Sequence, residues 1–164
     1  MRIRPDKPGP GQESVWDYPR PPRVEPVSGR VTIELNGQRI VDTTRALRVL
    51  ETSHPPTVYV PRADIVDGAL RDADGTSFCE FKGRAGYLDV VAGDRVAAKA
   101  AWYYPNPSRG YEQLVDHVAI YPGRMDECTL DGELVTAQEG DFYGGWITSR
   151  VVGPFKGAPG TWGW

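Results

Sequence analysis

Three segments in the middle of the chain combine aromatic side chains with polar groups that can do chemistry. They are residues 57–64, 78–83 and 101–107, with the sequences TVYVPRAD, FCEFKG and AWYYPNP. If a fold built of strands brings them together, they form a pocket with aromatic walls and with Arg, Asp, Cys and Lys side chains within reach. Such a composition is typical of a small-molecule site.

Cys79 and Lys82 are the first candidates for catalysis. Residues three apart on a strand point to opposite faces, so both reach one pocket only if the chain bends, which Gly83 permits. A neighbouring ammonium favours the thiolate, which would make Cys79 a nucleophile and leave Lys82 as an alternative reactive amine. The competing interpretation is that Cys79 is a small core residue.

Arg62 and Asp64 share one face of an extended chain, although Pro61 favours a strand end or a loop there. Arg62 can clamp a carboxylate or phosphate at two points, and Asp64 is a candidate acid or base. The alternative is an ion pair that holds the loop. Glu51 would pair with Arg62 or Lys82, or act as a general base if its pKa is raised.

Aromatic residues would form the walls of the pocket. Trp102 and Tyr104 alternate with Tyr103, so these two share one face of a strand and Tyr103 points to the other. They form a wall for a flat or sugar-like ligand, and Tyr59 supplies a phenolic hydrogen bond. Plain sheet packing is the alternative.

The composition is that of one globular domain. The chain has 164 residues, of which 40% are hydrophobic and 25% charged, with a net charge of -3. This charge argues against nucleic-acid binding, and no apolar run approaches the roughly 20 residues that cross a bilayer. Without an apolar signal core at the start, we predict a cytoplasmic protein that does not bind membranes.

Metal ligands are poorly represented. The two histidines, His54 and His117, and the two cysteines, Cys79 and Cys128, show no ligand spacing and no disulfide framework. We therefore predict no metal and no cofactor.

Short apolar segments separated by turn residues predict a mainly β fold. Asn36-Gly37 and Asp131-Gly132 each lie between apolar segments and are typical of hairpin turns. Residues 72–75, with the sequence DADG, are a predicted turn, and residues 64–70 a helical turn or loop. Without alternating helices, the pattern indicates antiparallel sheets in a sandwich or barrel.

The two ends differ from the middle in composition. We predict a Pro-rich arm at residues 1–27, a β domain at 28–140 and a Gly- and Trp-rich arm at 141–164. Exposed tryptophans are costly, so both arms are expected to wrap around the domain. A homodimer contact is the alternative, since exposed apolar patches mark interfaces.

The chain resembles the domain-of-unknown-function 427 family. The resemblance rests on Glu51 and on residues 56–64, 79–87 and 101–105, with a similar leader at residues 13–22. It implies a compact domain of mostly antiparallel sheet, similar to β-tent folds. Relatives in that wider group often hold zinc with paired cysteine motifs, which this chain lacks.

These patterns together predict a β domain that binds a small polar or anionic molecule. The alternatives are a small hydrolase or transferase that uses Cys79 or Lys82, and a homodimeric interaction module. The predicted ligand-binding residues are Tyr59, Arg62, Trp102 and Tyr104, and the predicted catalytic residues are Cys79, Lys82, Asp64 and Glu51.

Overall fold

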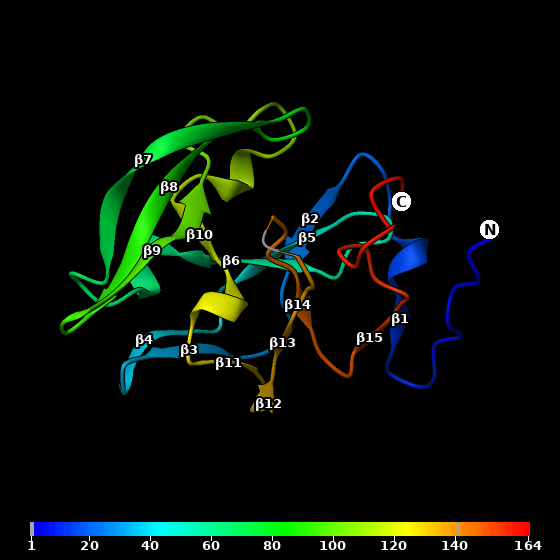
Figure 1. The fold of residues 1–164 in the computed structure, drawn as a ribbon, viewed down its shortest axis with the longest axis horizontal. Helices are drawn as coiled ribbons and strands as arrows, with labels where there is room; N and C mark the ends of the chain where they lie inside the picture. The colour runs from blue at the N-terminus through cyan, green and yellow to red at the C-terminus, as the bar shows by residue number, and fades with distance from the viewer. Residues whose placement is uncertain (1, 141) are drawn as a thin grey trace.

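The molecule is mainly β in the computed structural model, which describes residues 2–140 and 142–164 (Figure 1). The strands are β1 (Glu13–Ser14), β2 (Arg23–Pro26), β3 (Val31–Leu35), β4 (Gln38–Thr43), β5 (Leu47–Leu50), β6 (Thr57–Pro61), β7 (Leu70–Cys79), β8 (Gly83–Ala92), β9 (Arg95–Tyr103), β10 (His117–Ile120), β11 (Glu127–Leu130), β12 (Glu133–Leu134), β13 (Thr136–Ala137), β14 (Trp146–Ile147) and β15 (Val151–Val152). Single 3-10 turns are η1 (Val15–Asp17), η2 (Arg62–Asp64), η3 (Glu112–Leu114) and η4 (Pro122–Arg124). The prediction of a mainly β fold is confirmed. In the described part of the chain, no helix has the length and apolarity that a membrane span requires.

Two antiparallel sheets enclose the main core. The larger has the order β2-β5-β6-β10-β9-β8-β7, and the smaller has the order β12-β11-β3-β4. In Figure 1 the smaller sheet lies beneath β6 and β10, and the turn between β8 and β9 approaches it, where the Asn36 side chain donates to the Ala92 carbonyl over 2.9 Å. Branched side chains favour such pleated, half-buried surfaces. Those with about 1% exposure or less fill the space between the sheets, for example Ile33, Leu35, Val60, Leu88 and Ile120.

Both predicted hairpin turns are present. Asn36 and Gly37 join β3 to β4 with φ of 52° and 73°, and Asp131 and Gly132 join β11 to β12 with φ of 48° and 80°. Consecutive positive φ values are the geometry of the type I′ hairpin, whose twist matches that of the flanking strands.

The predicted turn at residues 72–75 is wrong. These residues lie inside β7, where the pairing with β8 slips between Ala73 and Thr76, and Gly75 has a φ of 99°. The turn-forming residues are therefore absorbed as a β-bulge within a long hairpin. Of the helical turn or loop expected at residues 64–70, the structure has a loop that leads into β7, and the helical turn lies earlier, at η2.

The two ends of the chain pack on each other and on the domain. β1 pairs with β15 in parallel, and the Trp16 indole N–H donates to the Pro154 carbonyl over 2.9 Å. The Trp16 ring lies 5.3 Å from that of Trp164. β2 is the edge strand of the larger sheet, although it falls within the predicted arm 1–27. The domain boundaries themselves stay a prediction.

Arg48 on β5 ties the first strand of the chain to the larger sheet. Its Nη1 donates to Glu13 over 2.8 Å and its Nε donates to Glu25 over 2.8 Å. The Arg48 side chain is only 20% exposed, so these charges interact more strongly than surface pairs do. One guanidinium thus holds β1, β2 and β5 together.

We predict that Arg48→Met destabilises the protein. The substitution leaves Glu13 and Glu25 close together without their cation, which should lower the free energy of unfolding by about 1–3 kcal/mol. Arg39, which pairs with Glu34 at the surface, is the matched control, and Arg39→Met should cost less than about 0.5 kcal/mol. Urea unfolding of both variants measures the difference, and equal losses would contradict the role of Arg48.

The ion pair between Arg48 and Glu25 predicts how stability depends on pH. Burial tends to raise the pKa of Glu25, but the hydrogen bond and charge of Arg48, with the charge of Arg23, lower it below 4.5 overall. A carboxyl with a lowered folded-state pKa contributes stability that is present above about pH 4.5 and lost as the pH falls through the folded-state pKa. The stability of Arg48→Met should therefore fall less steeply below that pH than that of the wild type.

Candidate functional site

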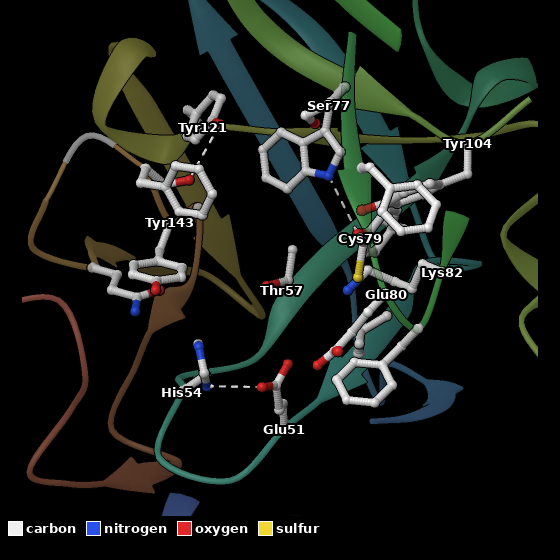
Figure 2. Close-up of a pocket in the computed structure, with 18 of the residues that line it drawn as sticks. Glu51, His54, Thr57, Ser77, Cys79, Glu80, Lys82, Tyr104, Tyr121 and Tyr143 are labelled. Atoms are coloured by element: carbon white, nitrogen blue, oxygen red, sulfur yellow. Dashed lines mark hydrogen bonds and ion pairs between the residues drawn. The ribbon is translucent and has the colours of Figure 1, made fainter. Parts of the chain in front are cut away.

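A cavity of about 320 Å³ opens beside the turn between β7 and β8 (Figure 2). Residues from β5, β6 and β9 form its floor, and the segment after β13 closes one side. The lining residues are Val49, Glu51, His54, Thr57, Tyr59, Ser77, Phe78, Cys79, Glu80, Phe81, Lys82, Tyr87, Trp102, Tyr104, Tyr121, Gln138, Phe142, Tyr143, Gly144 and Lys156.

A bend brings Cys79 and Lys82 to the same cavity. Cys79 pairs with Gly83 across the end of the β7–β8 hairpin, and Gly83 has a φ of 107°, a conformation that favours glycine. Figure 2 shows the Cys79 sulfur next to the Lys82 ammonium. The sharp turn overrides the alternation of an extended strand, which would have pointed these side chains to opposite faces.

Lys82 is a half-buried cation with no ion-pair partner among the residues that the structure describes. Its Nζ lies 5.8 Å from the centre of the Tyr104 ring. Burial tends to lower the pKa of Lys82, but nearby Tyr59, Cys79 and Glu51 outweigh it and raise this pKa above 10.5. Lys82 is therefore an ammonium at neutral pH and can attract an anion.

The aromatic wall has the predicted alternation. Trp102 and Tyr104 line the cavity, while Tyr103 packs against the core between the sheets. The Trp102 indole N–H donates to the Tyr59 hydroxyl over 3.3 Å, and its ring lies 4.5 Å from that of Tyr121. Burial raises the pKa of both Tyr59 and Tyr104, so both are neutral phenols. Neutral rings and one indole thus face the Lys82 ammonium.

Glu51 and His54 form a second polar corner of the cavity. Glu51 pairs with Arg20 at 3.3 Å, and His54 Nδ1 lies 2.9 Å from the Thr52 carbonyl. The Glu51 partner expected from the sequence was Arg62 or Lys82, and this expectation is corrected by the pair with Arg20. Arg20 lies in the N-terminal segment, far from Glu51 along the chain, so this pair is not evident from the sequence.

The neutral ring of His54 has one hydrogen-bond acceptor, Nε2. A carbonyl only accepts, so the Nδ1 that faces the Thr52 carbonyl carries the proton and Nε2 is the acceptor of the neutral ring. Burial lowers the pKa of His54 below 6.5 although Glu51 acts to raise it. The ring is therefore mostly neutral at neutral pH.

Arg62 and Asp64 lie outside the cavity. β6 ends at Pro61, and the η2 turn that follows places the Arg62 guanidinium 4.6 Å from the centre of the Tyr103 ring. Asp64 accepts from Arg45 over 2.6 and 3.1 Å, and these hydrogen bonds lower its pKa. The loop ion pair that the sequence allowed does involve Asp64, but its partner is Arg45, which comes from the chain before β5.

Sequence reasoning missed the residues that close the cavity from the C-terminal side. The segment with Tyr143 and Gly144 was identified as rich in aromatics and glycine, but nothing in its spacing showed where it docks. In the fold, the Gly144 backbone lies so close to the Trp102 indole that a Cβ at residue 144 would be 2.9 Å from Trp102 Cζ3. The available signal for this docking was a pair of consecutive glycines in the aromatic-rich C-terminal segment, since glycine often marks a close approach of the backbone to another group.

We predict that Gly144→Ala disturbs the cavity. The added methyl group would overlap Trp102 and approach Tyr121, and overpacking of this kind costs about 1–3 kcal/mol. The matched control is Gly163→Ala, where no atom lies near the added methyl group. Thermal unfolding together with the emission spectrum of tryptophan tests this. An unchanged melting temperature for Gly144→Ala would show that the segment does not hold Trp102.

No group of three or more histidine, cysteine, aspartate or glutamate side chains in residues 2–140 and 142–164 has the geometry to hold a metal ion. Cys128, the second cysteine, is buried, and burial raises the pKa of its thiol to about 12.

The fold and the cavity define a mainly β protein with antiparallel sheets and a small internal site. Residues 23–131 match the model of the family described as a domain of unknown function (DUF427). Since this match covers more than half of the chain, the protein belongs to that family. A comparison with curated proteins gave no match. The cavity therefore combines residues of the family region with residues that follow it, such as Tyr143 and Lys156.

Proposed function

We propose that this protein binds a small polar or anionic molecule in the cavity, with the Lys82 ammonium as the principal anchor. The observation that carries the proposal is a half-buried cation without an ion-pair partner among the described residues, in a cavity of about 320 Å³. A cation without an ion-pair partner can gain a charge-assisted hydrogen bond from an anionic ligand.

The other charged residues of the cavity are Glu51, Glu80 and Lys156, so two are anions and one is a second cation. Glu51 is compensated by Arg20, so its repulsion of a second anion is reduced. Attraction between Lys82 and an anion is stronger here than in bulk water because the surroundings are less polar. At the other corner, the His54 Nε2 can accept a hydrogen bond from a hydroxyl or amine of the same ligand.

The aromatic walls provide contact area for the rest of the ligand. Trp102 and Tyr121 line the cavity with rings 4.5 Å apart from centre to centre, whereas Tyr59 and Tyr104 are almost fully buried, at 1% and 6% exposure, and add little surface to it. Aromatic side chains contribute large contact areas with well-defined geometry. A ligand with an anionic group and a compact apolar body fits this arrangement.

The test is a thermal-shift screen against nucleotides, organic acids, sugars and common cofactors, followed by calorimetric titration. A compound present at 100 times its Kd stabilises the protein by about 2.7 kcal/mol, which corresponds to a shift of about 5–10 °C for a chain of this size. We expect the hits to be anions. Lys82→Met should weaken them at least tenfold, on the order of a lost charged hydrogen bond.

Two controls define this experiment. Lys82→Arg keeps the positive charge and should retain most of the binding, whereas Lys7→Met removes an exposed lysine of the N-terminal segment and should change nothing. Binding of anions with equal affinity by the wild type and Lys82→Met would overturn the role of Lys82. A complete screen without a hit would overturn the proposed function.

An enzyme that uses Cys79 is the second candidate, favoured by the position of its thiol beside the Lys82 ammonium. A cation next to a thiol stabilises the thiolate and speeds its reactions. This role predicts that iodoacetamide alkylates Cys79 faster than it alkylates a free thiol at pH 7, and that Lys82→Met removes the advantage. Buried Cys128 is the internal control and should react slowly. A rate no greater than that of a free thiol excludes Cys79 as the nucleophile.

A further inference from the structure

A second cavity lies directly behind the first. It has a volume of about 240 Å³, and three of its lining residues, Phe142, Tyr143 and Lys156, also line the first cavity. Trp162 forms its outer wall. The two spaces therefore share one boundary, and that boundary is made by the C-terminal part of the chain.

Tyr143 lies within this boundary and contacts both sides. On the side of the first cavity, its ring packs edge to face on His54 at 5.2 Å, and Figure 2 shows it between Tyr121 and His54. On the other side, its ring lies 6.2 Å from that of Trp162. The Lys156 ammonium lies 5.4 Å from the centre of the Tyr143 ring. The Tyr143 ring is thus a partition between two cavities.

The partition is held in place by its neighbours. Gly144, the next residue, packs its backbone against the Trp102 indole, which restricts the main chain on that side. His54, Lys156 and Trp162 contact the ring from several directions, so a change of rotamer would disturb all three contacts. A ligand in the first cavity therefore meets a fixed wall.

Apart from the Lys156 ammonium, which lines both cavities, the second cavity has few polar groups to offer. The Thr161 hydroxyl accepts from the Gly157 N–H over 2.9 Å and donates to the Ala158 carbonyl over 2.7 Å, so its hydrogen-bonding capacity is largely used within the chain. Its remaining walls include the rings of Phe142 and Trp162. If the partition is removed, the added space would accept an apolar ring and not a polar group.

We propose that Tyr143 sets the length limit of the ligand, and that the ligand is a compact aromatic acid with a single ring. This inference rests on the proposed function, because it takes the Lys82 ammonium as the anchor of the acid group. A carboxylate at Lys82 would place its ring toward Trp102 and Tyr121, which line the cavity. Figure 2 shows Tyr143 on the side of the cavity opposite Lys82, which is the side toward which a longer molecule would extend.

The test compares two probes that share one head group. Benzoate has a single ring, and biphenyl-4-carboxylate carries a second ring in line with the first. In calorimetric titrations the wild type should bind benzoate on the order of tenfold more tightly than biphenyl-4-carboxylate, because the partition rejects the longer probe. Tyr143→Ala joins the two cavities and should improve the binding of biphenyl-4-carboxylate at least tenfold, with little change for benzoate.

Two further variants separate the partition from a general loosening of the C-terminal segment. Tyr143→Phe keeps the ring and should behave as the wild type does. Trp162→Ala enlarges the second cavity but leaves Tyr143 held by His54, by Lys156 and by the Gly144 backbone, so the longer probe should still be rejected. If Trp162→Ala admits biphenyl-4-carboxylate as well as Tyr143→Ala does, Tyr143 does not set the limit.

The outcomes for the inference and for the proposed function differ. If the wild type binds both probes equally well, the length limit is overturned while an anion site at Lys82 stands. If benzoate does not bind but another anion binds in a manner that depends on Lys82, the aromatic acid is the wrong class. If no anion of the whole screen binds, the proposed function fails, and the inference fails with it.

Discussion

The close approach of the Gly144 backbone to the Trp102 indole connects the two parts of the site. Trp102 belongs to the larger sheet and Gly144 to the C-terminal segment, and a side chain larger than hydrogen at residue 144 would separate them. Through this contact the segment is anchored on the sheet, Tyr143 is held beside His54, and one side of the cavity is closed. The absence of a Cβ at residue 144 matters because protein interiors are densely packed and have few gaps into which neighbouring side chains can shift.

Charge compensation is uneven around the cavity. Arg20 pairs with Glu51, Arg45 with Asp64, and Arg48 with two glutamates. Arg45 holds Asp64 at two points, which suits the planar fork of a guanidinium. Lys82, Lys156 and Glu80 line the cavity without an ion-pair partner among the residues that the structure describes. Lys82 has a thiol and aromatic rings around it.

Local patterns predicted a considerable part of the fold. The hairpins at Asn36-Gly37 and Asp131-Gly132 follow from the φ preferences of those residues, and the opposite faces of Trp102 and Tyr103 follow from strand alternation. Both are properties of a few consecutive residues. The turn predicted at residues 72–75 failed because the same residue types also suit a bulge, and only pairing with β8 decides between them. Arg62 and Asp64 failed as site residues because the 3-10 turn after Pro61 carries them away from the cavity.

The sequence by itself determined the fold class, the two hairpin turns and most of the aromatic and polar residues from which the cavity is built. These depend on alternation, turn chemistry and composition, which are encoded over short distances along the chain. The tertiary structure alone decided which charges pair, that Cys79 and Lys82 meet at one bend, and that Tyr143 and Gly144 close the cavity. These contacts join residues far apart in the chain, as Arg20 and Glu51 do, and their geometry depends on packing that no local pattern specifies.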